Sequence, residues 1–82
     1  MLIQEIKVKL LEAFPNAEVF VKNTRSMHVG HDHSGYHLKA IIKYDGFKDL
    51  TLLDQHRMVY KVLKQEMNNG IIHALSIEVK ND

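Results

Sequence analysis

The alternation of apolar and polar residues along this chain predicts five short elements in the order helix, strand, strand, helix, strand. In two segments the apolar side chains recur every three or four residues, which is typical of a helix with one buried face. In three other segments they alternate with polar residues, as in a strand with one buried face. In chain order the five segments are residues 2–14, 17–23, 36–44, 51–67 and 71–80.

Local signals set the ends of the predicted helices. Pro15 ends the first helix, because the residue before a proline resists helical geometry. Thr51 begins the second helix, with Asp54 at the position where a capping box prefers Glu or Gln. The Asn-Asn-Gly segment at 68–70 ends it with residues that accept left-handed backbone angles. Residues 24–35 lack periodicity and hold two glycines, which predicts a loop.

The predicted core takes one face of each element. His73 has the same parity as Leu75, Ile77 and Val79, which predicts a position on the core face of the last strand. Because it lies at the start of the strand, hence at the rim of the sheet, it could equally present one ring nitrogen outward. The expected core stripe of the second helix is Leu52, His56, Val59, Leu63 and Met67. Three strands with two helices on one face form a two-layer α+β sandwich, whose other, more polar face is open to solvent.

Composition narrows the class of protein. A chain of 82 residues with 45% hydrophobic content predicts a single small domain, residues 1–82. The absence of cysteine excludes disulfides, thiolate zinc sites and a cysteine nucleophile, and it excludes an iron–sulfur cluster held by this chain alone through thiolates. The N-terminal segment does not resemble a secretory signal and no apolar run could cross a bilayer, so we expect a soluble, cytoplasmic protein.

Histidine is the conspicuous residue type, with six in the chain and four of them within ten residues. His28, His31, His33 and His37 occur as H-x2-H-x-H-x3-H, and imidazole is a common ligand for zinc, copper, nickel and iron. The spacing matches no closed structural zinc site, so a metal-binding loop and a solvated polar loop both remain open. His37 is expected on the exposed face of its strand, and His56 is expected to have a structural role.

Other chemistries find little support in the sequence. No G-x-S-x-G elbow and no glycine-rich phosphate loop are present, and the acidic residues are scattered, so we expect no enzymatic activity. The formal net charge is +1 and the chain has two arginines, which argues against strong binding to nucleic acid. Nucleic acid nevertheless remains the better competitor, because the predicted order of elements is reminiscent of KH modules, although their G-x-x-G clamp is absent.

Two stretches resemble the BolA-like family. HRMVYKVLKQEMNNGIIHALSI at 56–77 is similar to the family's H-R-x-V-Y…H-A-L pattern, and HSGYHLKAIIKYDGF at 33–47 is similar to its S-x-H-F-x-V stretch. The resemblance covers nearly the whole chain and implies a class-II-KH-like α-β-β-α-β sandwich. The chain departs from the family where Gln55 replaces the first arginine of R-H-R and where residues 47–49 replace an F-x-G turn.

The resemblance also implies a function. Members of the family are non-enzymatic partners of monothiol glutaredoxins, with which they share a [2Fe-2S] cluster in iron–sulfur assembly, trafficking or iron signalling. The family's histidine ligand corresponds to His73, and the second ligand comes from the loop, at His28 or its near alternatives His31 and His33. The partner and its glutathione would supply the thiolates.

The resemblance gives further expectations for the surface. Arg57 and Tyr60 are candidates for a surface that contacts the partner or nucleic acid. The alternative function is that of a KH-like, nucleic-acid-binding transcriptional regulator, with DNA bound weakly. No membrane partner is expected, and self-association stays open.

Overall fold

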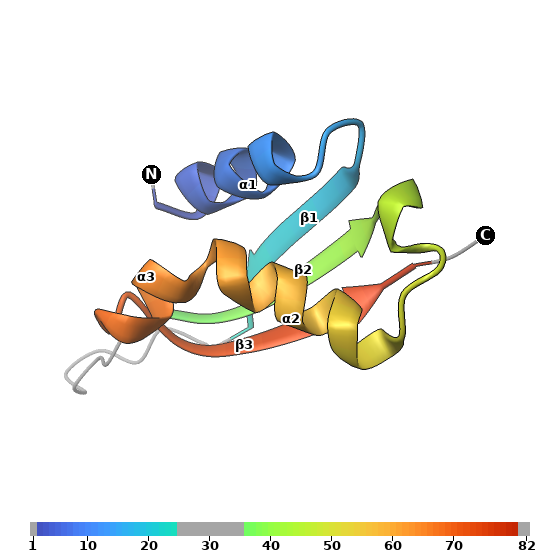
Figure 1. Cartoon of the computed structure of the whole chain (residues 1–82). Helices are drawn as coiled ribbons and strands as arrows, with labels where there is room; N and C mark the ends of the chain where they lie inside the picture. The colour runs from blue at the N-terminus through green and yellow to red at the C-terminus, as the bar shows by residue number, and fades with distance from the viewer. Residues whose placement is uncertain (1, 25–35, 81–82) are drawn as a thin grey trace, which may run out of the picture.

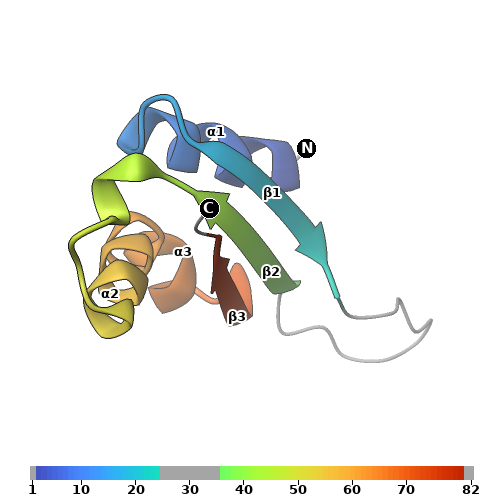
Figure 2. The ribbon, with the colours of Figure 1, turned by 90° about the vertical axis from the view of Figure 1, so that its right-hand side faces the viewer.

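The computed structural model describes residues 2–24 and 36–80 and confirms the two-layer α+β sandwich. In the described part of the chain, three α-helices lie on one side of a three-stranded sheet, and the other side of the sheet is open (Figures 1 and 2). The helices are α1 (Leu2–Ala13), α2 (Leu52–Val62) and α3 (Lys64–Asn68), and a 3-10 helix, η1, spans Asp45–Phe47. The strands are β1 (Glu18–Asn23), β2 (Tyr36–Lys43) and β3 (Ile72–Val79).

The sheet has the order β1-β2-β3, with β1 antiparallel and β3 parallel to the central strand. Val19 pairs with Ile42, and both are buried under the helices, as the alternation predicts. A parallel partner requires a long crossover, and η1, α2 and α3 supply it on the same side as α1. The opposite face carries the exposed Phe20 and the lysine-rich outward positions of β2.

The core lies between the sheet and the helices. Phe14, Tyr44 and Phe47 form a group of aromatic rings with centroids 5.1–5.2 Å apart. Gly46 follows Tyr44 closely in the turn after β2, and a Cβ at this position would meet the Tyr44 ring, so a larger residue would displace that ring. The buried hydrophobic residues are Ile6, Leu10, Phe14, Val19, Leu38, Ala40, Ile42, Phe47, Val59, Leu63 and Ile72.

The second helix differs from its prediction in two ways. It begins as predicted, since the Thr51 Oγ1 accepts a hydrogen bond from the Asp54 N–H at 3.1 Å. Its buried positions are Gln55, Val59 and Leu63, however, whereas Leu52 is 61% exposed, so the predicted Leu52–His56 part of the stripe is wrong. The physical reason is that two carbonyl oxygens between η1 and α2 need a hydrogen-bond donor. The Gln55 Nε2 donates to the carbonyl oxygens of Phe47 and Leu50, both at 2.9 Å.

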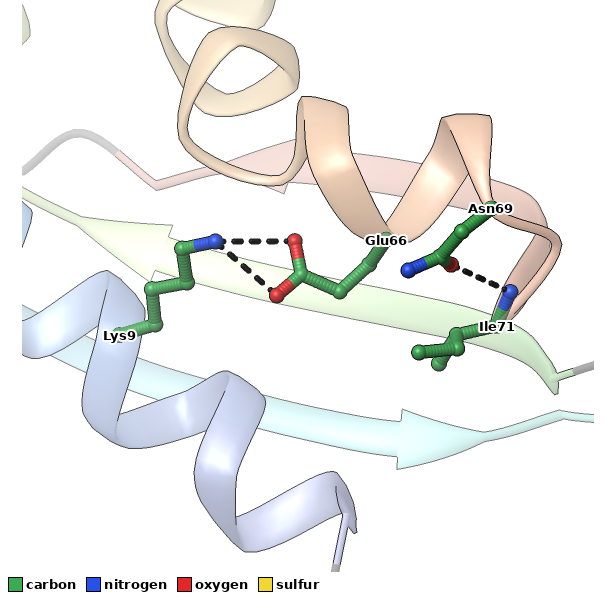
Figure 3. A network of polar contacts seen from close by, with 4 residues as sticks. All are labelled: Lys9, Glu66, Asn69 and Ile71. Atoms are coloured by element: carbon green, nitrogen blue, oxygen red, sulfur yellow. Dashed lines mark hydrogen bonds and ion pairs between the residues drawn. The ribbon is translucent and has the colours of Figure 1, made fainter.

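The predicted second helix is also interrupted, since the structure has two helices, α2 and α3, in its place. The backbone of Leu63 departs from helical values (φ −101°, ψ 15°), and the chain continues from there as α3. The turn redirects α3 so that Glu66 contacts α1, where its carboxylate accepts two hydrogen bonds from the Lys9 Nζ, at 2.9 and 3.0 Å (Figure 3). Gly70 ends this segment at φ +83°, as the Asn-Asn-Gly signal predicts.

Candidate functional site

The candidate site lies at the start of β3, where His73 stands at the rim of the sheet. Of the two orientations expected for His73, the core position is wrong: Ile72 is buried there and His73 is exposed. The cause is an irregularity in the pairing, since Tyr36 is opposite Ile72 while His37 is opposite Ala74, leaving His73 as an extra residue. A bulge of this kind reverses the parity of the strand and changes the direction of a side chain. His73 is therefore available to a ligand or partner.

The turn before this strand fixes its starting point. The Asn69 Oδ1 accepts a hydrogen bond from the Ile71 N–H at 3.0 Å (Figure 3). The Ile71 carbonyl in turn accepts a hydrogen bond from the Tyr36 N–H at 2.9 Å, which joins the segment to the first residue of β2. The histidine thus sits on a backbone held from two sides.

His37 is the residue that the structure brings to His73. The centroids of the two imidazole rings are 5.1 Å apart and the ring planes are inclined by 35°. His37 lies on the open face of β2, as expected, and is half-buried. Its carbonyl oxygen accepts hydrogen bonds from the Thr24 N–H at 2.7 Å and the Thr24 Oγ1 at 3.1 Å, which fixes the end of the strand. The sequence pattern did not predict that these two histidines lie close together, because their proximity depends on the bulge.

Charged residues occupy the open face beyond the two histidines. Glu78 Oε1 lies 3.2 Å from Lys39 Nζ, and Glu78 Oε2 lies 3.6 Å from Lys80 Nζ. The hydrogen bond and positive charge of Lys39, with a smaller contribution from Lys80, lower the pKa of Glu78. A lowered carboxyl pKa contributes stability at neutral pH that is lost as the pH falls through the lowered value.

Replacing Lys39 with methionine should therefore raise the pKa of Glu78 towards the ordinary glutamate range. The Glu78 carboxyl carbon, followed by NMR as the pH is lowered, reports the change directly. Lys80→Met is the matched control and should shift the pKa less, because Lys80 contributes less to the lowering. An unchanged Glu78 pKa in the Lys39 variant would contradict the assignment of this ion pair.

Arg57 and Tyr60 lie on an exposed side of α2. The Tyr60 hydroxyl donates a hydrogen bond to the Leu75 carbonyl oxygen at 3.3 Å, which connects α2 to β3 two residues beyond His73. The Arg57 side chain is 69% exposed, with Nη1 3.7 Å from Asp54 Oδ1. An exposed ion pair of this kind contributes little stability, so the guanidinium can exchange its partner at low cost.

The remaining histidines are His28, His31, His33 and His56. His28, His31 and His33 lie outside the described residues. His56 is half-buried on α2. Within residues 2–24 and 36–80, no cluster of three or more His, Asp or Glu side chains is placed to hold a metal ion. The arrangement offers imidazole nitrogens for binding, and the chain has no cysteine to supply a thiolate.

Comparison with known proteins identifies the family. A family model described as BolA-like protein matches residues 10–82. This chain belongs to the BolA-like family. None of the helices in the described part of the BolA-like chain is long and apolar enough to span a membrane.

The relatives of this BolA-like chain agree in sequence and in fold. It is 37% identical over 73 residues to a BolA-like protein of Dictyostelium discoideum, covering 89% of this chain and 64% of that one. A bacterial relative, the DNA-binding transcriptional regulator BolA of Haemophilus influenzae, is 29% identical over 76 residues, covering 93% and 73%. The solved BolA domain of SufE1 from Arabidopsis thaliana superposes with a TM-score of 0.79 at 33% identity, covering 95% and 88%. The chain thus spans less than two thirds of the Dictyostelium relative.

Proposed function

We propose that this BolA-like chain is a non-enzymatic binding module that pairs with a monothiol glutaredoxin and shares a [2Fe-2S] cluster with it. The observation that carries the proposal is the exposed imidazole of His73, turned out of the core by the bulge at the start of β3. Such a protein would act in iron–sulfur cluster assembly and trafficking or in iron signalling.

The donor set of the chain fits half of a cluster site. Iron–sulfur clusters are usually held by four thiolates, although histidine can replace cysteine on one of the two irons of a [2Fe-2S] centre. This chain has no thiolate to offer and an exposed imidazole. We therefore assign the thiolates to the partner and its glutathione. A bound cluster would supply redox and cluster-transfer chemistry, while the chain orients the imidazole and presents it to the partner.

The second ligand in this proposal comes from the segment before β2. His28 is the leading candidate, with His31 and His33 as near alternatives, and all three lie outside the described residues. The hydrogen bonds from Thr24 to His37 support a loop that begins and ends close to the start of β3. The exposed side of α2 with Arg57 and Tyr60 is the proposed partner-contacting surface, since the Tyr60 hydroxyl donates a hydrogen bond to Leu75 in the strand that carries His73.

Co-reconstitution tests the proposal. The chain is mixed with a monothiol glutaredoxin, glutathione, ferrous iron and sulfide, and the product is separated by size-exclusion chromatography. We expect a heterodimer that carries one [2Fe-2S] cluster and whose visible spectrum differs from that of the glutaredoxin alone, because imidazole replaces thiolate. Elution of the chain without iron, together with an unchanged glutaredoxin spectrum, would contradict it.

A second function, DNA binding in a transcriptional regulator, is supported by one surface feature. Lys9, Lys61 and Lys64 line a groove between α1 and the α2–α3 segment, and Glu66 neutralises the charge of Lys9, which leaves Lys61 and Lys64 as its basic side chains. The Haemophilus relative is named as a DNA-binding regulator, which points the same way. Binding of duplex DNA that weakens steeply with salt and is lost in Lys61→Gln/Lys64→Gln would favour this function. The net charge of +1 favours the first function.

A further inference from the structure

We propose that His37 and His73 together form a two-imidazole site for a single divalent transition-metal ion such as Zn²⁺. His73 is common to this site and to the proposed cluster site, but the ion site takes His37 as its second ligand and needs neither a partner nor the loop histidines. It combines a residue of β2 with the extra residue of β3, and both side chains lie on the open face at the rim of the sheet.

The separation of the two rings matches that of two imidazoles on one tetrahedral ion. A zinc–nitrogen bond of about 2.0–2.1 Å places each ring centre roughly 3.2 Å from the metal, and a tetrahedral angle then separates the two centres by about 5 Å. The observed separation of the ring centroids is 5.1 Å. The planes are inclined by 35° rather than parallel, and the broad preference of the histidine χ2 angle allows the nitrogens to turn towards a common point.

The backbone holds the two histidines in this relation before any ion arrives. On one side, Thr24 donates two hydrogen bonds to the carbonyl of His37. On the other, the parallel pairing of β2 and β3 fixes Ala74 opposite His37 and Leu75 opposite Leu38. Without the bulge, His73 would point into the core, on the opposite face from His37. The irregularity is therefore what creates the pair.

The donors indicate which ions fit. Two imidazole nitrogens suit zinc, copper and nickel, whereas magnesium and calcium require oxygen ligands. Across the described residues no third His, Asp or Glu joins the pair to form a three-ligand group. Water would complete the coordination sphere, so the ion should exchange readily, unlike the ion of a closed structural zinc site.

Titration of the full 82-residue chain with zinc chloride tests this site. Calorimetry gives the affinity, and NMR of the imidazole nitrogens identifies the ligands. We expect the resonances of His37 and His73 to shift together with the first equivalent of zinc. His37→Gln and His73→Gln should each lower the affinity roughly tenfold or more. His56→Gln is the control and should leave it unchanged, and magnesium chloride should shift neither histidine.

A further variant distinguishes zinc binding by His37 and His73 from zinc binding by the loop histidines. His28→Gln/His31→Gln/His33→Gln should retain the affinity for the first equivalent of zinc if the strand pair binds it. Loss of binding in that variant, with full affinity in the His37 and His73 variants, would overturn the proposal and assign the zinc to the loop. Proton–nitrogen correlation spectra show whether each variant keeps its fold. If the chain binds no zinc through His37 and His73, the proposal of a shared cluster is unaffected, because cluster sharing requires His73 and not His37.

Discussion

Replacing His73 with alanine should strongly reduce cluster sharing with the glutaredoxin while the chain stays folded. The side chain is exposed, so its removal leaves no cavity in the core. It takes away a proposed metal ligand, and we expect roughly a tenfold or larger loss in the yield of cluster-bound heterodimer. The measurement is the visible absorption of the co-eluting complex, with circular dichroism of the isolated chain to confirm the fold.

Two further variants make the His73 result specific. His56→Ala removes a half-buried histidine from α2 and should leave the visible spectrum of the complex unchanged. His73→Cys offers a thiolate in place of imidazole, so it should restore cluster binding with a lower reduction potential, since thiolate makes the cluster more negative. A full yield with an unaltered spectrum in His73→Ala would remove His73 from the ligand set.

Replacing Phe47 with alanine should lower the free energy of unfolding by about 3–5 kcal/mol. The ring is fully buried and packs against Phe14 and Tyr44, with centroids 5.2 and 5.1 Å away. Its loss removes apolar contact area and leaves a cavity where η1 joins the core. Because small domains are stable by only about 5–15 kcal/mol, this single change removes a large part of the total. Chemical denaturation followed by circular dichroism measures it.

Phe20 provides the matched control for Phe47. It is the same residue type but 63% exposed on the open face, where the Lys7 Nζ lies 5.9 Å from its ring centroid. Phe20→Ala should change the free energy of unfolding by less than about 1 kcal/mol, because little buried contact is lost. Equal destabilisation by the two variants would show that the packing of Phe14, Tyr44 and Phe47 is not central to the stability of the core.

Periodicity predicts most of this fold because the faces of α1, β1 and β2 follow simple rules. Ile6, Leu10 and Phe14 recur at helical spacing and are buried, and the alternation around Leu38 and Ala40 matches the burial of β2. Propensity and spacing report local geometry well where each element has a constant period. The order of elements and the single-sided arrangement of helices follow from these segments.

The predictions from periodicity are wrong where a tertiary contact or a strand irregularity decides which side chain is buried. Gln55 points inward because its Nε2 donates hydrogen bonds to the carbonyl oxygens of Phe47 and Leu50. No local pattern in the sequence predicts these contacts. The exposure of His73 depends on one extra residue between paired strands, and periodicity assumes that no such residue exists. The adjacent Ile71 and Ile72, both apolar, are the single local hint that the parity changes there. The candidate site was therefore found by family resemblance, while its companion His37 required the structure.

The parallel pairing of β2 with β3 has a consequence for how the chain folds. His37 and Ala74 are neighbours across the sheet although nearly half the chain separates them. Contacts of such long range form slowly, because loop closure precedes the gain from pairing. The antiparallel β1–β2 pair closes over a much shorter loop. We therefore expect the β1–β2 hairpin to form before the two histidines come together, so a ligand that requires both histidines should bind only the fully folded molecule.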